Sequence, residues 1–121
     1  MHTIKFIGIV GSRRRNSAED YLLVLEAFLK IYKPWDIIVS GGCPKGADNF
    51  AEQIATAYKI SIVIHRAEWD KYGKAAGFKR NTYIAQDADV LIACVASDRK
   101  GGTEDTIKKY VKLGKKELLL V

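Results

Sequence analysis

Cysteine is scarce in this chain, and the long apolar runs that could cross a membrane are missing. The 121 residues include two cysteines, Cys43 and Cys94, which are too few for a disulfide framework and lie at no metal-ligand spacing. No segment has the apolar core of a secretory signal peptide or the length of a transmembrane helix. We therefore expect a cytoplasmic, reduced protein that carries no metal or other cofactor and does not bind a membrane.

Internal repeats and low-complexity segments are also missing, and the length corresponds to a single domain over residues 1–121. A chain of this size buries roughly two-thirds of its unfolded surface without disulfides. The formal net charge of +6 favours an anionic partner. Lysines on predicted helix surfaces, such as Lys108, Lys109 and Lys112, are expected to be solvated, so the charges beside glycine turns are the more informative ones.

The apolar pattern alternates between strands and helices along the whole chain. Strands are predicted over residues 4–10, 35–40, 61–64, 90–95 and 118–121, and helices are predicted to begin after Ser17 and near Ala47, Phe78 and Thr103. Five strands alternating with four helices predict an α/β fold with a parallel sheet, right-handed crossovers and helices on both faces. The segment from His65 to Gly77 has no clear period, so it is a candidate functional loop.

Two of the predicted helices have apolar stripes that indicate their buried faces. Ser17 with Asp20 three residues later is the pattern of a capping box at the start of the first helix. The residues expected to face the core are Leu22, Leu25, Phe28 and Leu29 in the first helix and Ile107, Tyr110 and Val111 in the last.

Glycine turns follow three of the strands. The stretch 37–51 (IIVSGGCPKGADNFA) combines a strand that ends at Ser40, a turn with Gly41, Gly42 and Gly46, and the start of a helix. Glycine tolerates positive φ and leaves the backbone bare, and the amides of a helix's first turn favour an anion, most often phosphate. Similar turns occur at Gly11–Ser12 and at Gly101–Gly102–Thr103. Because loops after parallel strands gather at one edge of the sheet, we expect the three turns to converge on one crevice.

Four motifs resemble a known family. GSR follows the first strand, SGGCPKGAD the second and GGTEDTI the fourth, and AEWDKYGKAAGFKRN lies in the long segment. Together they resemble the YspA-like, YpsA-related branch of the SLOG superfamily over nearly the whole chain. The resemblance implies a Rossmann-like sheet of strand order 3-2-1-4-5 that binds a nucleotide or a nucleotide-derived ligand. Analogy with the related LOG proteins further implies a homodimer.

The LOG proteins are phosphoribohydrolases that cleave the N-glycosidic bond of a nucleoside monophosphate, and Arg80 resembles their catalytic arginine in its placement. A guanidinium there would clamp a phosphate through two parallel hydrogen bonds, unless it forms only a surface salt bridge. Thr106 occupies the position of the catalytic glutamate of LOG proteins, so this chain lacks that glutamate. Asp105, or less favourably Glu104, would substitute as the second catalytic group, although a carboxylate there is also an ordinary helix-dipole partner. Whether the protein is an enzyme stays open.

The remaining candidates surround the same crevice. Arg13 would reach a phosphate, whereas Arg14 and Arg15 are expected to face water. Asp48 would accept a ribose hydroxyl or cap backbone amides, and Trp69 would stack on a base or, as we favour, pack in the core. The full predicted ligand-binding set is Gly11, Ser12, Arg13, Ser40, Gly41, Gly42, Gly46, Asp48, Trp69, Arg80, Asn81, Gly101, Gly102 and Thr103.

Two functions are therefore compared. The first is the binding of a nucleotide or nucleotide-derived small molecule, with N-glycosidic cleavage as the reaction if one is catalysed. The alternative is a non-catalytic, Smf-like module that binds single-stranded nucleic acid through Arg13 to Arg15, the lysines and Trp69. No strand alternates aromatic and basic residues, which argues mildly against the alternative.

Overall fold

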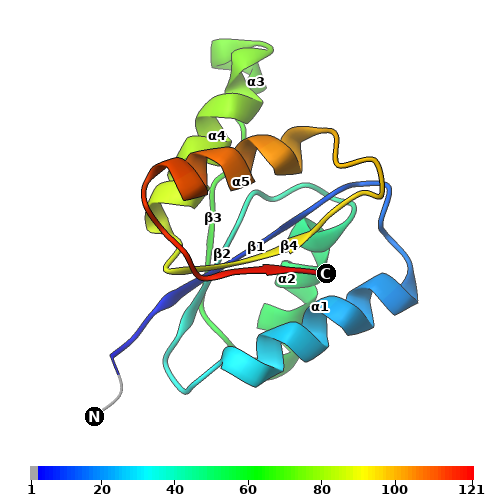
Figure 1. Cartoon of the computed structure of the whole chain (residues 1–121), viewed down its shortest axis with the longest axis vertical. Coiled ribbons are helices and arrows are strands. Elements are labelled where there is room, and N and C mark those ends of the chain that lie inside the picture. Colours follow the sequence, from blue (N-terminus) through cyan, green and yellow to red (C-terminus); the bar gives the residue numbers. More distant parts are fainter. Residues whose placement is uncertain (1–2) are drawn as a thin grey trace.

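A five-stranded parallel sheet forms the middle layer of the structure, a computed structural model that describes residues 3–121 (Figure 1). The strand order is β3-β2-β1-β4-β5, as the family resemblance implies, and all four pairings are parallel. The predicted Rossmann-like α/β fold is confirmed; the first two residues of the predicted domain lie outside the described part. The strands are β1 (Phe6–Gly11), β2 (Ile37–Ser40), β3 (Ile62–Ile64), β4 (Val90–Cys94) and β5 (Leu118–Leu120), and the helices are α1 (Ala18–Ile31), α2 (Ala47–Tyr58), α3 (Trp69–Tyr72), α4 (Ala75–Asp87) and α5 (Gly102–Lys112).

Helices cover both faces of the sheet. In Figure 1, α1 and α2 lie on one face, and α4 and α5 lie on the other. Successive side chains of a strand point to opposite faces, so Ile9 packs toward α1 and α2 while its neighbour Val10 packs toward α4 and α5. The two cores meet at the sheet, and all five residues of β4 are buried. This layering leaves the loops at the carboxyl ends of the strands free to form a site.

The predicted buried stripe of α1 is correct at two of its four positions. Ser17 and Asp20 do form the predicted capping box, with the Asp20 amide donating to the Ser17 hydroxyl at 3.0 Å. Phe28 is buried as predicted, and the partly buried Leu25 packs against the core. Leu22 and Leu29, however, are exposed, and Val24, which was not predicted, is buried. Apolar residues occur on several sides of this helix, so only the packing against the sheet selects which of them are buried.

The last helix departs from its predicted stripe at a single position. Ile107 and Tyr110 of α5 are buried as predicted. Val111 is exposed, because one residue beyond Tyr110 turns the side chain by about 100° around the helix axis. The predicted inward position of Val111 is therefore wrong.

The segment without a clear period folds into helix rather than one long loop. It contains the short helix α3, and α4 begins at Ala75, three residues before the predicted Phe78. Gly73 (φ 55°) ends α3, and its amide donates to the Trp69 carbonyl at 2.8 Å. Gly77 lies inside the first turn of α4, where its low helix propensity hides the start of the helix.

A buried carboxylate organises the turn before β2, which begins at Ile37 rather than at Trp35. Trp35 has a positive φ of 78° and is 80% exposed, so it does not belong to the strand. The neighbouring Asp36 is buried and accepts hydrogen bonds from the backbone amides of Lys5 (3.0 Å) and Lys33 (2.9 Å) and from the Lys5 ammonium (2.5 Å). Asp36 thereby ties the start of β1 to the start of β2.

Candidate functional site

A cavity of about 290 Å³ opens where the chain leaves β1 and β4 toward opposite faces of the sheet. Crevices at such switch points are the usual ligand sites of open α/β sheets. We call it the switch-point cavity. Its lining residues are Val10, Gly11, Ser12, Arg13, Arg14, Cys43, Asp48, Arg80, Asn81, Ile84, Lys100, Gly101, Gly102, Thr103 and Thr106.

A second cavity of about 200 Å³ adjoins the first, and we call it the Trp69 cavity. The two share Arg13, Cys43 and Arg80 as lining residues. The glycine turn at 41–42 opens into the second cavity, whereas the turns at 11 and 101–102 open into the first, so the expected single crevice is divided in two. The Trp69 cavity is lined by Arg13, Gly41, Gly42, Cys43, Pro44, Arg66, Ala67, Trp69 and Arg80.

The Arg80 side chain lies in the wall that the two cavities share. Its Nη1 atom donates to the Gly41 carbonyl at 2.9 Å and its Nε atom to Asn81 Oδ1 at 2.9 Å. A Cβ added at Gly41 would come within 2.9 Å of Arg80 Cδ. The bare backbone of Gly41 is thus covered by Arg80 rather than left open. Within residues 3–121 Arg80 forms no ion pair, so the alternative of a surface salt bridge is wrong.

Asp48, in the first turn of α2, is the carboxylate that lines the switch-point cavity. It is buried, and its Oδ2 atom accepts a hydrogen bond from the Cys43 amide at 3.1 Å. Burial raises the pKa of Asp48 above its ordinary value, although the Cys43 amide and the nearby Arg80 guanidinium act in the opposite direction. Of the two roles predicted for Asp48, the structure shows the capping of a backbone amide.

Replacing Asp48 with asparagine should raise the melting temperature at pH 7 to 8. Because the pKa of Asp48 is higher in the folded than in the unfolded state, ionisation favours unfolding, and stability is lost as the pH rises through the folded-state value. Asparagine keeps an acceptor for the Cys43 amide and carries no charge. The gain should disappear near pH 3, where the wild-type carboxyl is protonated in both states. Thermal unfolding from pH 3 to 8, with the exposed Glu26→Gln as control, measures this; a pH-independent difference would contradict it.

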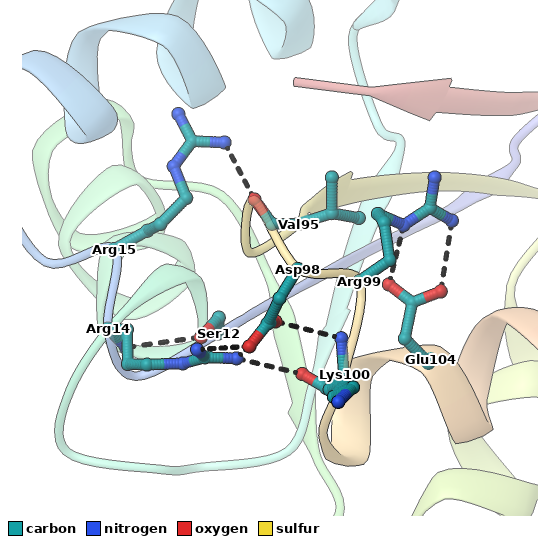
Figure 2. Close-up of polar contacts among 8 residues, drawn as sticks. All are labelled: Ser12, Arg14, Arg15, Val95, Asp98, Arg99, Lys100 and Glu104. Carbon is teal, nitrogen blue, oxygen red and sulfur yellow. Dashed lines mark hydrogen bonds and ion pairs between the residues drawn. The ribbon is translucent and has the colours of Figure 1, made fainter.

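The three consecutive arginines after β1 have different surroundings. Arg13 is exposed, lines both cavities and forms no hydrogen bond or ion pair with the described residues. Figure 2 shows Arg14 pairing with both carboxylate oxygens of Asp98, each at 2.8 Å, and donating to the Lys100 carbonyl at 3.1 Å. The Arg14 guanidinium holds the pKa of Asp98 below its ordinary value. The loops after β1 and β4 are therefore linked across the mouth of the switch-point cavity.

Arg15 does not face water as expected. Its guanidinium is half-buried, pairs with Asp20 at 2.8 Å and donates to the carbonyls of Val95 (3.1 Å) and Val121 (2.5 Å). Figure 2 shows Arg15 extending away from Arg14 toward Val95. Arg15 is a structural residue, which leaves Arg13 as the arginine of this run with donors available to a ligand.

The carboxylates at the start of α5 are engaged with other side chains. Glu104 pairs with Arg99 through two contacts of 2.8 and 2.9 Å (Figure 2). Asp105 accepts from Asn81 Nδ2 at 3.1 Å and from the Lys109 ammonium at 2.7 Å. Neither carboxylate lines either cavity, so Asp105 is joined to the switch-point cavity only through Asn81.

Two further predicted residues support the site without lining a cavity. The buried Ser40 hydroxyl donates to the Asp48 carbonyl at 3.3 Å. Gly46 (φ 75°) donates its amide to Asn16 Oδ1 at 2.8 Å and lies against the backbone of Ser12. The favoured prediction that Trp69 packs in the core is wrong. Trp69 is 52% exposed and lines the Trp69 cavity.

Several lining residues are absent from the predicted ligand-binding set. Cys43 and Thr106 lie within the quoted motifs and Lys100 directly precedes the third of them, but none was assigned a ligand-binding role. Arg66 and Ala67 belong to the segment from His65 to Gly77 that was a candidate functional loop, and this loop after β3 reaches the Trp69 cavity. The position of this loop at the carboxyl edge of a parallel sheet was the available signal.

The described part of the chain, residues 3–121, has neither a candidate metal cluster nor a helix that could cross a membrane. Residues 3–121 contain no cluster of three or more histidine, cysteine, aspartate or glutamate side chains arranged for a metal ion. Over the same part of the chain, every helix is too short or too polar to cross a membrane.

Comparison with known proteins identifies the fold and a relative. No model of a known protein family matches the sequence. The structure resembles the molybdenum cofactor binding protein from the phototrophic bacterium Rippkaea orientalis with a TM-score of 0.68 and 20% identity, over 99% of this chain and 77% of the other. The sequence is 31% identical over 87 residues to the Gene 61 protein of Mycobacterium phage D29, which covers 67% of this chain and 69% of that protein. The chain therefore belongs to the same family as the Gene 61 protein of Mycobacterium phage D29.

Proposed function

We propose that this protein binds a nucleotide or a nucleotide-derived small molecule at the carboxyl edge of its sheet, with the phosphate in the switch-point cavity. The observation that carries the proposal is Arg13, an exposed guanidinium at the mouth of this cavity without a partner among residues 3–121. Arginine donors in a fixed fork suit the oxygens of a phosphate group.

The surroundings of the switch-point cavity also favour an anion. Arg14, Lys100 and Arg80 line it together with Arg13, against the single carboxylate of Asp48. Helix α5 begins at the cavity with Gly102 and Thr103, and its first-turn amides and dipole add positive potential there. The resemblance to the YspA-like branch of the SLOG superfamily and the cofactor-binding name of the structural neighbour agree with a small, nucleotide-derived ligand.

Replacing Arg13 with alanine should weaken the binding of AMP about tenfold to hundredfold, because a hydrogen bond to a charged group contributes about 1.5–3 kcal/mol. Isothermal titration calorimetry with AMP and ADP-ribose measures the affinity. Lys116→Ala removes an equal charge just before β5, at the opposite edge of the sheet, and should leave binding unchanged. Equal losses in both variants would show that Arg13 supplies only general charge, and the absence of any nucleotide binding by the wild type would refute the proposal.

N-glycosidic cleavage is the reaction that the resemblance to LOG proteins favours, with Arg80 and Asp105 as the proposed catalytic pair. Asp105 is held by Asn81 and Lys109, whereas Asp48 lines the cavity. Chromatographic detection of free adenine after incubation with AMP tests the reaction. Loss of adenine release in Asp105→Asn but not in Asp48→Asn would support Asp105 as the carboxylate involved.

Binding of single-stranded nucleic acid is the alternative function. The same titrations, repeated at several salt concentrations, distinguish it from nucleotide binding. Affinity for an oligonucleotide that neutralises several phosphates falls by about 0.7 log unit per phosphate for each log unit of salt. An AMP site lined by a few fixed donors should depend much less on salt. Stabilisation by oligonucleotides alone, with a steep salt dependence, would favour the alternative.

A further inference from the structure

We infer that the Trp69 cavity is the subsite for the nucleobase, so that one nucleotide spans both cavities, with its base on Trp69 and its phosphate in the switch-point cavity. This inference rests on the proposed function and names how the ligand is divided between the two cavities. The inference is carried by the position of the exposed indole ring of Trp69. It lines a cavity that shares a wall with the cationic switch-point cavity.

The two cavities are small when each is taken separately. At about 290 Å³ the switch-point cavity is at the lower limit of the roughly 300–1,000 Å³ that is usual for small-molecule sites, and the Trp69 cavity, at about 200 Å³, is below that range. Because both cavities are lined by Arg13, Cys43 and Arg80, a ligand that lies along this shared wall would contact both.

Trp69 is fixed at one edge and exposed beside the cavity. One edge of its indole ring lies against Gly77 in the first turn of α4, where an added Cβ would be 3.3 Å from Trp69 Cη2. The side chain is nevertheless 52% exposed and lines the cavity. An indole that is packed at one edge and half exposed beside a cavity is a platform for stacking, as aromatic residues are for nucleobases.

The part of the Trp69 cavity beyond the wall it shares with the first cavity is mostly apolar. Pro44 and Ala67 are apolar, and Gly42 forms part of the wall. Arg66 donates to the Gly42 carbonyl from its Nη1 atom at 3.3 Å, and its only carboxylate neighbour within residues 3–121 is Glu52 at 3.9 Å. An aromatic surface with one loosely paired guanidinium, besides the shared Arg13 and Arg80, suits a flat base with acceptor atoms on its edge. The first turn of α5 and Lys100 line only the other cavity and favour the phosphate there.

The experiment uses the two tryptophans of the chain. Trp35 lies before β2, at the opposite edge of the sheet from the carboxyl-end loops, and is 80% exposed. In a Trp35→Phe variant, Trp69 is therefore the single fluorescent tryptophan. AMP and GMP should change its emission with saturation, whereas ribose 5-phosphate should bind in calorimetry without changing the emission.

Affinities then locate the base. AMP should bind roughly fivefold to 150-fold more tightly than ribose 5-phosphate, the range expected for stacking on one aromatic ring. Trp69→Ala should remove this advantage while leaving the affinity for ribose 5-phosphate unchanged, and Trp69→Phe should retain part of it. Tyr72→Ala, in the same short helix but outside both cavities, controls for damage to α3.

The outcomes separate this inference from the proposed function. If AMP and ribose 5-phosphate bind equally well and Trp69→Ala changes neither, the base does not occupy the Trp69 cavity, although the phosphate site stands. If the wild type binds neither compound, both the proposed function and this inference are refuted. An equal loss of AMP affinity in Trp69→Ala and Tyr72→Ala would also overturn the inference, because it would trace the effect to the helix.

Discussion

Replacing Asp36 with alanine should lower the free energy of unfolding by about 3–5 kcal/mol, the cost of removing one partner of a buried ion pair. The Asp36 side chain is fully buried, while Lys5 beside it keeps 22% of its side-chain surface exposed. The substitution would leave the backbone amides of Lys5 and Lys33 without this acceptor and the Lys5 ammonium without its counter-charge. Urea denaturation followed by circular dichroism measures the change.

Two controls make the Asp36 result specific. Asp36→Asn keeps an acceptor oxygen and should lose less stability than alanine, because part of the hydrogen bonding survives. Glu26→Ala breaks the exposed pair between Glu26 and Lys30 and should change stability by less than about 1 kcal/mol. Similar losses in Asp36→Ala and Glu26→Ala would contradict a structural role for the buried carboxylate.

Replacing Gly46 with alanine should both destabilise the fold and weaken AMP binding. At φ 75° and ψ −157°, Gly46 has a backbone conformation that is essentially restricted to glycine, and another residue there costs about 1–3 kcal/mol. The new Cβ would also lie 2.6 Å from the Ser12 carbonyl oxygen and 3.3 Å from the Cα atom of Arg13. Relief of this collision requires the loop after β1 to move, and Arg13 would move with it.

A second glycine provides the matched control for Gly46. Gly114 also has a positive φ, 81°, but an added Cβ there meets no atom within 4 Å. Gly114→Ala should therefore cost only the backbone strain, about 1–2 kcal/mol, and leave AMP affinity unchanged. Melting temperature and calorimetric affinity, measured on both variants, distinguish the effects. Unchanged AMP affinity in Gly46→Ala would show that the position of Arg13 does not depend on this contact.

The sheet could be predicted from the sequence because its signals are local. Runs of β-branched residues such as 37–39 mark buried strands, and the regular alternation with helices indicates a parallel sheet. The strand order came from the family resemblance and is confirmed. The exposure of Leu22 and Leu29 and the burial of Val24 on α1 could not be predicted in this way, since they depend on which side of the helix meets the sheet.

The site was predicted in its position but not in its internal arrangement. Gly11, Gly101 and Arg13 were placed at the carboxyl edge by topology alone, and they line a cavity there. The contact of Arg80 with Gly41 joins residues 39 positions apart, and the contact of Arg15 with Val121 joins residues 106 positions apart. No local pattern encodes such pairings, so the division into two cavities and the structural role of Arg15 emerge only from the folded chain.

A long, jointed side chain in the shared wall makes the width of the site adjustable. Arg80 lines both cavities together with Arg13 and Cys43, and it is held by one hydrogen bond to the Gly41 carbonyl and one to Asn81. Rotation about the side-chain bonds of Arg80 would change the shape of this wall without any movement of strand or helix. We therefore expect the same rigid scaffold to admit ligands of different length, at the cost of these two hydrogen bonds.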